Sequence, residues 1–98
     1  MMTKESAKQR VAWDKAMFAK HGITKFHHYF GKYEVTGSRW YVAIVNGKAY
    51  KFTSDHQGWT QGAPWGYERA TASPESRTAF YMRRFAKADA WVKEQVGA

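Results

Sequence analysis

Histidine is the residue type in this sequence with the widest chemistry, because an imidazole can bind a metal ion or transfer a proton near neutral pH. The chain has four histidines. His27 and His28 are adjacent, and neighbouring side chains on a strand point to opposite faces, so their rings cannot readily share one ion. His21 and His56 are isolated in the sequence. The histidine pattern therefore predicts no metal site.

Catalytic motifs are also missing from the sequence. Nicking enzymes pair two histidines that are separated by one residue, a spacing that His27 and His28 do not match, although Tyr81 could stand in for the tyrosine nucleophile. The eight acidic residues are scattered, so they form no carboxylate cluster for two-metal nuclease chemistry. The sequence has no glycine-rich phosphate loop and no serine elbow. These observations favour binding over catalysis, and they predict no cofactor.

The densest group of cations lies in the last quarter of the chain and consists of Arg77, Arg83, Arg84 and Lys87. Guanidinium groups bind phosphates or carboxylates through two parallel hydrogen bonds, so this group is a candidate contact surface. Asp89 and Glu94 follow on the same segment, and a solvated helix face is an equally good explanation.

A tryptophan-rich segment from 54 to 73 gathers the residue types that dominate protein interfaces, namely Trp59, Trp65, Tyr67 and Arg69. The segment is roughly neutral, which favours a protein partner over phosphates. A loop that packs its own aromatic rings against one face of the sheet explains the composition equally well. An X-Pro bond in a flexible loop samples the cis form, so Pro64 is a candidate cis-proline on which a host prolyl isomerase could act.

Two helices and a sheet are predicted to position these residues. Thr3 caps a helix over 4–20, and Ser73-Pro74 begins a second helix over 74–96. The core face of the second helix is predicted to consist of Tyr81, Phe85, Ala88 and Val92. Between the helices, apolar residues alternate with a period of two, which predicts a three-stranded antiparallel meander over about 25–35, 39–45 and 48–53.

Asn46-Gly47 is the strongest turn signal, because a type I′ turn needs positive φ at both central residues. The register that follows from this turn gives the sheet two apolar faces. One face carries Tyr41, Ala43, Tyr50 and Phe52, and the other carries Trp40, Val42, Ile44 and Ala49. The rings alternate with lysines as in a base-stacking sheet, although core packing is the more common explanation.

The fold class that these elements predict is α+β, with one domain over residues 1–98. We expect the helices to cover one face of the sheet. The long loop over 54–73, or a partner, would then cover the second apolar face.

Composition limits the cellular setting and the partner. The sequence has no cysteine, which suits the reducing cytoplasm, and its longest apolar run, over 41–45, is far too short to cross a membrane. The net charge of +8 attracts nucleic acid or an acidic protein surface.

Three stretches cover most of the chain: TKESAKQRVAWDKAMFAKHG, KFHHYFGKYEVTGSRWYVA and SPESRTAFYMRRFAKADAWVKEQ. In size and character the chain resembles small accessory proteins of temperate lambdoid phages, and among these the second anti-RecBCD protein family. The resemblance implies a protein that binds the host RecBCD helicase-nuclease on its RecC subunit. Such a protein alters the processing of DNA ends so that the recombination system of the phage can act.

Two functional hypotheses follow from the sequence. The leading one is a non-catalytic protein that modulates or inhibits a host DNA-processing nuclease or helicase, with the 59–69 segment and the second helix as contact surfaces. The alternative is a basic module that binds single-stranded DNA, RNA or duplex DNA directly.

Overall fold

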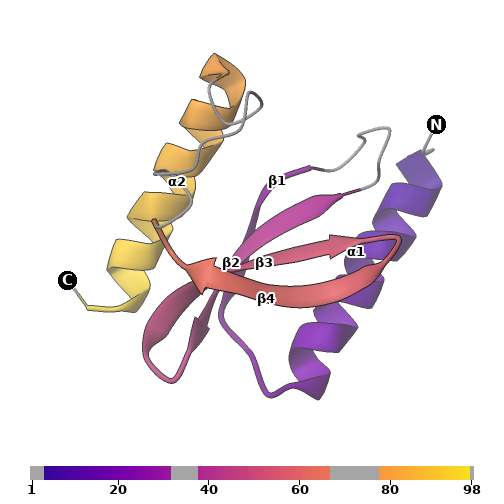
Figure 1. Cartoon of the computed structure of the whole chain (residues 1–98), viewed down its shortest axis with the longest axis horizontal. Helices are drawn as coiled ribbons and strands as arrows, with labels where there is room; N and C mark the ends of the chain where they lie inside the picture. The colour runs from indigo at the N-terminus through magenta and orange to yellow at the C-terminus, as the bar shows by residue number, and fades with distance from the viewer. Residues whose placement is uncertain (1–3, 32–37, 67–77, 98) are drawn as a thin grey trace.

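The computed structural model of the chain describes residues 4–31, 38–66 and 78–97. The elements follow in the order α1 (Lys4–Lys20), β1 (Phe26–Phe30), β2 (Arg39–Val45), β3 (Lys48–Asp55), β4 (Gly58–Pro64) and α2 (Ala79–Gln95). Figure 1 shows the strands crossing the middle of the molecule, with α2 on the left and α1 on the right. The α+β class, with a helix before the sheet and a helix after it, is confirmed.

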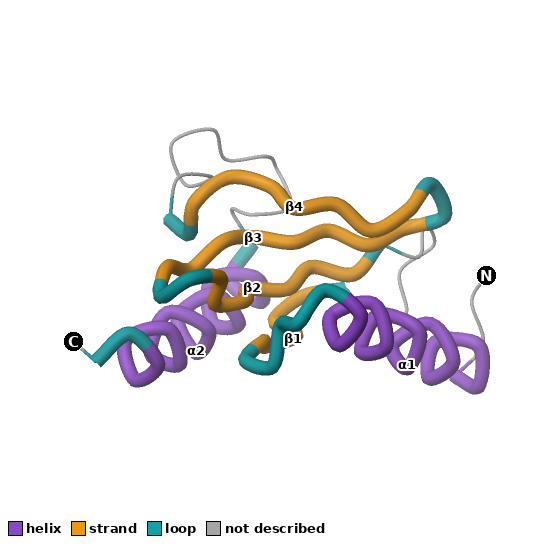
Figure 2. The backbone as a smooth tube through the Cα atoms, turned by 90° about the horizontal axis from the view of Figure 1, so that it is seen from below, coloured by secondary structure: helices purple, strands orange, loops and turns teal. Residues whose placement is uncertain are grey.

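The strands form one antiparallel sheet in the order β1-β2-β3-β4, seen as successive strands in Figure 2. The predicted hairpin between β2 and β3 is confirmed, because Val45 pairs with Lys48. Asn46 has a φ of 52° and Gly47 a φ of 80°, as a type I′ turn requires. The turn thus fixes the register of the two central strands.

The sheet has a fourth strand that the sequence does not predict. The segment expected to be a loop from 54 onward continues β3 to Asp55 and then forms β4, with Ser54 opposite Trp59 and Asp55 opposite Gly58. β4 contains two glycines and ends at Pro64, which are residues that weaken a strand prediction. As an edge strand it has only β3 as a neighbour, and edge strands tolerate glycine and proline.

The two helices lie on opposite faces of the sheet, so the expectation that both would cover one face is wrong. From α1, Phe18 joins a buried cluster with Tyr41 and Phe52. From α2, Phe85 joins a second cluster with Tyr29 and Val42. The predicted division of the strand residues between two faces is confirmed. Each apolar face of the sheet packs against one of the two helices. The protein itself therefore covers the second face as well as the first.

The boundaries of the second helix and the first strand differ from the prediction. α2 begins at Ala79, where the Thr78 hydroxyl accepts a hydrogen bond from the Tyr81 amide at 3.1 Å, and not at Pro74. The predicted cap at Ser73-Pro74 and the second turn at 36–37 lie outside the described residues. β1 covers residues 26–30 of the predicted 25–35 strand, whose last part lies outside the described residues, and the predicted core face of α2 is buried.

None of the helices in the described part of the chain is long and apolar enough to cross a bilayer.

Candidate binding surfaces

A buried polar network joins α1 to the sheet. Asp14 of α1 is fully buried and accepts hydrogen bonds from Arg39 at 2.6 and 3.2 Å, from the Tyr41 hydroxyl at 2.5 Å and from the Ser54 hydroxyl at 2.5 Å. Arg39 also donates to the Ser54 hydroxyl at 2.7 Å. The carboxylate and the guanidinium therefore neutralise each other inside the protein. The network positions α1 on the sheet and leaves little of its charge for a ligand.

The charges in this network shift two pKa values. Burial by itself would lower the pKa of Arg39, but the hydrogen bond and the negative charge of Asp14 outweigh it, so the pKa lies above its ordinary value. Burial is also the main reason that the pKa of Tyr41 is raised, and its hydrogen bond to Asp14 adds to the shift. Arg39 therefore stays charged and Tyr41 stays a proton donor throughout the physiological range.

Trp59, predicted to contact a partner, packs inside the cluster on the α1 side. Its ring stacks on Phe52 with a centroid distance of 4.9 Å and on His21 at 4.9 Å, and it meets the edge of Phe18 at 5.1 Å. The side chain is partly buried, and its indole N–H is buried without a hydrogen-bond partner among the described residues. The ring therefore contributes mainly to the interior of this protein.

Trp65 lies on the opposite face, in the cluster under α2. Its ring stacks on Phe85 with centroids 4.5 Å apart and planes within 8°, and its indole N–H donates to the Asp89 carboxylate at 3.0 Å. The sheet thus separates Trp59 and Trp65, and the structure does not bring them together as one surface. The described chain contains no cis peptide bond, so the bond before Pro64, the candidate cis-proline, is trans in this structure.

The other predicted contact residues divide between described and undescribed parts of the chain. Tyr67, Arg69 and Arg77 lie outside the described residues. Arg83, Arg84 and Lys87 are exposed on α2, as the sequence predicts. Arg84 lies over the Phe80 ring, with its guanidinium carbon 5.2 Å from the ring centroid.

Arg84 and Lys87 belong to a stripe of α2 that sequence analysis did not recognise. We call the residues Phe80, Arg84, Lys87 and Trp91, together with His27 of β1, the α2 flank. Phe80 is 50% exposed and its ring contacts Phe30 with centroids 5.9 Å apart. Trp91 stacks on His27 at 5.6 Å. The spacing 80, 84, 87 and 91 is helical, so the stripe was visible in the sequence once α2 was placed.

The electrostatics of the α2 flank are dominated by its two cations. Burial is the largest cause that lowers the pKa of His27, and the charges of Arg84 and Lys87 lower it further. His27 is therefore neutral at pH 7, and the flank presents two positive charges beside two large rings. Glu94 follows Lys87 by two helical turns and bounds the cationic part.

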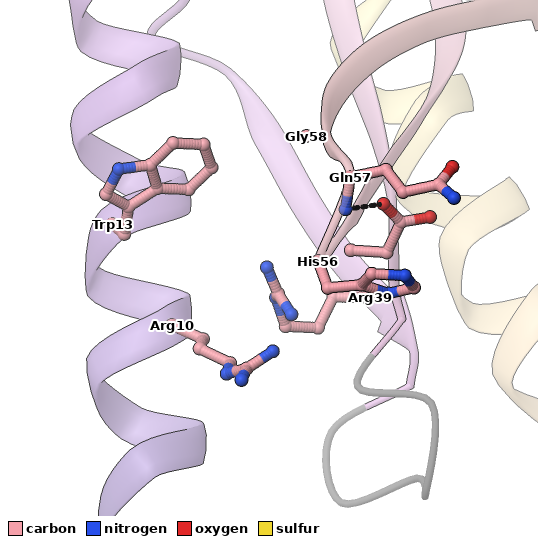
Figure 3. A pocket seen from close by; sticks show the side chains of 7 residues that line it. Arg10, Trp13, Arg39, His56, Gln57 and Gly58 are labelled. Carbon is pink, nitrogen blue, oxygen red and sulfur yellow. Dashed lines mark hydrogen bonds between the residues drawn. The ribbon is translucent and has the colours of Figure 1, made fainter.

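A separate cleft lies between α1 and the turn that joins β3 to β4 (Figure 3). Its volume is about 260 Å³, and its lining residues are Arg10, Trp13, Arg39, Asp55, His56, Gln57 and Gly58. Trp13 of α1 is 47% exposed. The spacing of Arg10 and Trp13 indicates one helix face, but the opposite wall is formed where the chain turns from β3 into β4, which the sequence does not predict.

Metal ligation has no candidate site in the described part of the chain, where no three histidine or acidic side chains gather around a common point. Comparison of the chain with protein-family models, with curated proteins and with solved structures finds no match.

Proposed function

We propose that this protein is a non-catalytic, phage-type binding protein that modulates or inhibits a host DNA-processing nuclease or helicase through protein–protein contacts. In this proposal it acts in the cytoplasm of the bacterial host. The contact surface is the α2 flank. The resemblance described above makes a RecBCD-like enzyme, contacted on RecC, the first partner to test.

The observation that carries the proposal is the half-exposed Phe80 beside Arg84, on a helix whose adjoining face is already buried in the core. Large aromatic residues and arginine are enriched in protein interfaces and supply most of their binding energy. Arg84 lies over the ring in the unbound protein, so part of the side-chain ordering that binding requires is already present. The two cations favour an acidic partner surface.

Replacement of Phe80 by alanine tests the proposal. We expect the affinity for the purified RecBCD-like enzyme to fall by roughly tenfold or more, because an aromatic hot spot is worth about 2 kcal/mol or more. The measurement is calorimetry or biolayer interferometry with nuclease-treated proteins, alongside the nuclease activity of the enzyme. Arg84→Glu should weaken binding as well, through repulsion from an acidic surface.

Met82 provides the matched control, because it is 51% exposed on the same helix but lies outside the α2 flank. Met82→Ala should leave affinity and inhibition unchanged. The proposal is wrong if Phe80→Ala binds the enzyme as tightly as the unmodified chain. It is also wrong if the Met82 variant loses as much affinity as the Phe80 variant.

A further inference from the structure

The cleft between α1 and the β3–β4 turn, far from the α2 flank in sequence and on the other helix, contains an aromatic ring that neither core uses. The Trp13 indole is 47% exposed and belongs to neither buried cluster. Figure 3 shows this ring projecting from α1 on one side of the cleft, with the turn residues on the other side. A flat ligand can therefore reach the indole from solvent and stack on it.

Arg10 places a positive charge one helical turn before Trp13, on the same side of α1. Its side chain is exposed and forms no ion pair with another described residue. Arg39 differs, because its guanidinium is held by Asp14 and Ser54 at the base of the cleft. Arg10 is thus the cation of this cleft that can meet an anionic group of a ligand.

The opposite wall supplies polar groups instead of further charge. The Asp55 carboxylate accepts a hydrogen bond from the backbone N–H of Gln57 at 2.8 Å, and the side chains of His56 and Gln57 are exposed. Asp55 adds a negative charge to the lining of the same cleft, so an isolated small anion gains little from it. A ligand that fits must combine a flat ring, hydrogen-bonding edges and a separate negative group.

We propose that this cleft holds one unpaired nucleotide of a single-stranded nucleic acid. The base stacks on Trp13, its edge meets the polar wall at Gln57, and an adjoining phosphate pairs with Arg10. The net charge of +8 draws the polyanion to the surface. A duplex does not fit, because its bases are stacked inside the helix and cannot reach the indole.

The test uses a fluorescein-labelled 12-nucleotide single strand of mixed sequence and measures its anisotropy with the full chain at low salt. Trp13→Ala is expected to weaken binding by roughly tenfold, which is typical for the loss of one base-stacking ring. Trp13→Phe should recover part of the affinity, because a phenyl ring still stacks. The matched duplex should bind more weakly than the single strand.

Two controls distinguish binding in the cleft from attraction by the net charge of the protein and from binding at the α2 flank. Arg10→Gln and Lys15→Gln each remove one exposed positive charge from α1, and we expect a clear loss only for Arg10. Phe80→Ala should leave strand binding unchanged, so this test and that of the α2 flank can fail separately. Circular dichroism and melting temperature confirm that each variant is folded.

Three results would overturn the proposal. The first is equal affinity of the unmodified chain and Trp13→Ala for the strand. The second is a result that indicates attraction by charge alone, namely an equal loss for Arg10→Gln and Lys15→Gln or equal binding of the duplex. The third is the absence of strand binding together with loss of a protein partner in the Trp13 variant, which would assign the cleft to a protein interface.

Discussion

Asp14 is the residue on which the attachment of α1 to the sheet depends most. It is fully buried, and its two carboxylate oxygens accept four hydrogen bonds from Arg39, Tyr41 and Ser54. A buried ion pair of this kind stabilises weakly compared with apolar packing, but breaking it leaves one charge buried without a partner. The network therefore acts mainly by fixing the position of α1 on the sheet. The position of α1 in turn determines the shape of the cleft.

Replacement of Asp14 by asparagine should lower the free energy of unfolding by about 3–5 kcal/mol, because Arg39 keeps its charge and loses its counter-ion. Urea denaturation monitored by circular dichroism measures the change. Asp55→Asn is the matched control, since Asp55 is only partly buried, and we expect a loss below about 1 kcal/mol. Comparable losses in the two variants would contradict the role assigned to the network.

Trp59 and Trp65 belong to two separate cores, and this placement makes a prediction about stability. We expect each alanine substitution to lower the free energy of unfolding by roughly 2–4 kcal/mol, somewhat below the cost of deleting a fully buried ring. Because the rings share no contact residue in the described structure, the double variant should show nearly additive losses. An unchanged melting temperature would show that both rings are available to a partner.

At the level of elements, the beginning of α2 is the clearest difference from the sequence prediction. Ser73-Pro74 has all the features of a helix start, yet the hydroxyl that caps α2 belongs to Thr78. Both sites satisfy the same local rule, so local chemistry could not choose between them. Tyr81 is the first residue of α2 that packs in the core, which places the helix start one turn before it.

Thr78→Ala should therefore lower the free energy of unfolding by about 1 kcal/mol, through loss of the cap to the Tyr81 amide. Thr78→Ser keeps the hydroxyl and should restore most of that stability. Thermal denaturation followed at 222 nm provides the measurement. A larger loss in Ser73→Ala than in Thr78→Ala would instead support the earlier helix start.

The missed fourth strand has a different origin. Gly58, Gly62 and Pro64 interrupt the local pattern, and Thr60 and Gln61 are exposed, so no alternation of apolar residues remains to be recognised. β4 forms because the polar backbone edge of β3 needs a neighbour, and because Trp59 within β4 and Trp65 just after it pack against the two buried clusters. Both causes depend on tertiary contacts, so the sequence of the segment by itself does not reveal them.

For the whole molecule, the environment of His27 predicts how stability changes with pH. Its folded pKa lies below the ordinary value of 6.5, so the unfolded chain binds a proton more readily than the folded one. The contribution of His27 to the free energy of unfolding should therefore be fully present above about pH 6.5. It should decrease as the pH drops below that value. The contribution is lost progressively down to the folded pKa.

Urea denaturation at a series of pH values between about 5 and 8 tests this expectation. His27→Gln should flatten the curve in that range, whereas His56→Gln, at an exposed turn position, should not. Arg84→Gln should reduce the slope, because it removes one of the charges that oppose protonation of His27. A slope that is unchanged in His27→Gln would show that another group causes the pH dependence.

The sequence by itself determined the elements whose signals are local. Asn46-Gly47 sets the central hairpin and, with it, the division of the strand residues between two faces. The helical spacing of Tyr81, Phe85 and Val92 sets the buried face of α2. These features depend on backbone conformation and on side-chain period, which are properties of short segments.

Only the tertiary structure decided which part of the chain covers each face of the sheet and which side chains stay exposed to a ligand. A sheet with two apolar faces can be covered by its own helices, by its own rings or by a partner, and the hydrophobic effect does not choose between them because it is non-directional. The structure places α1 and α2 on opposite faces and draws Trp59 and Trp65 inward. It therefore leaves Trp13 and Phe80, two rings in helices, exposed beside arginines.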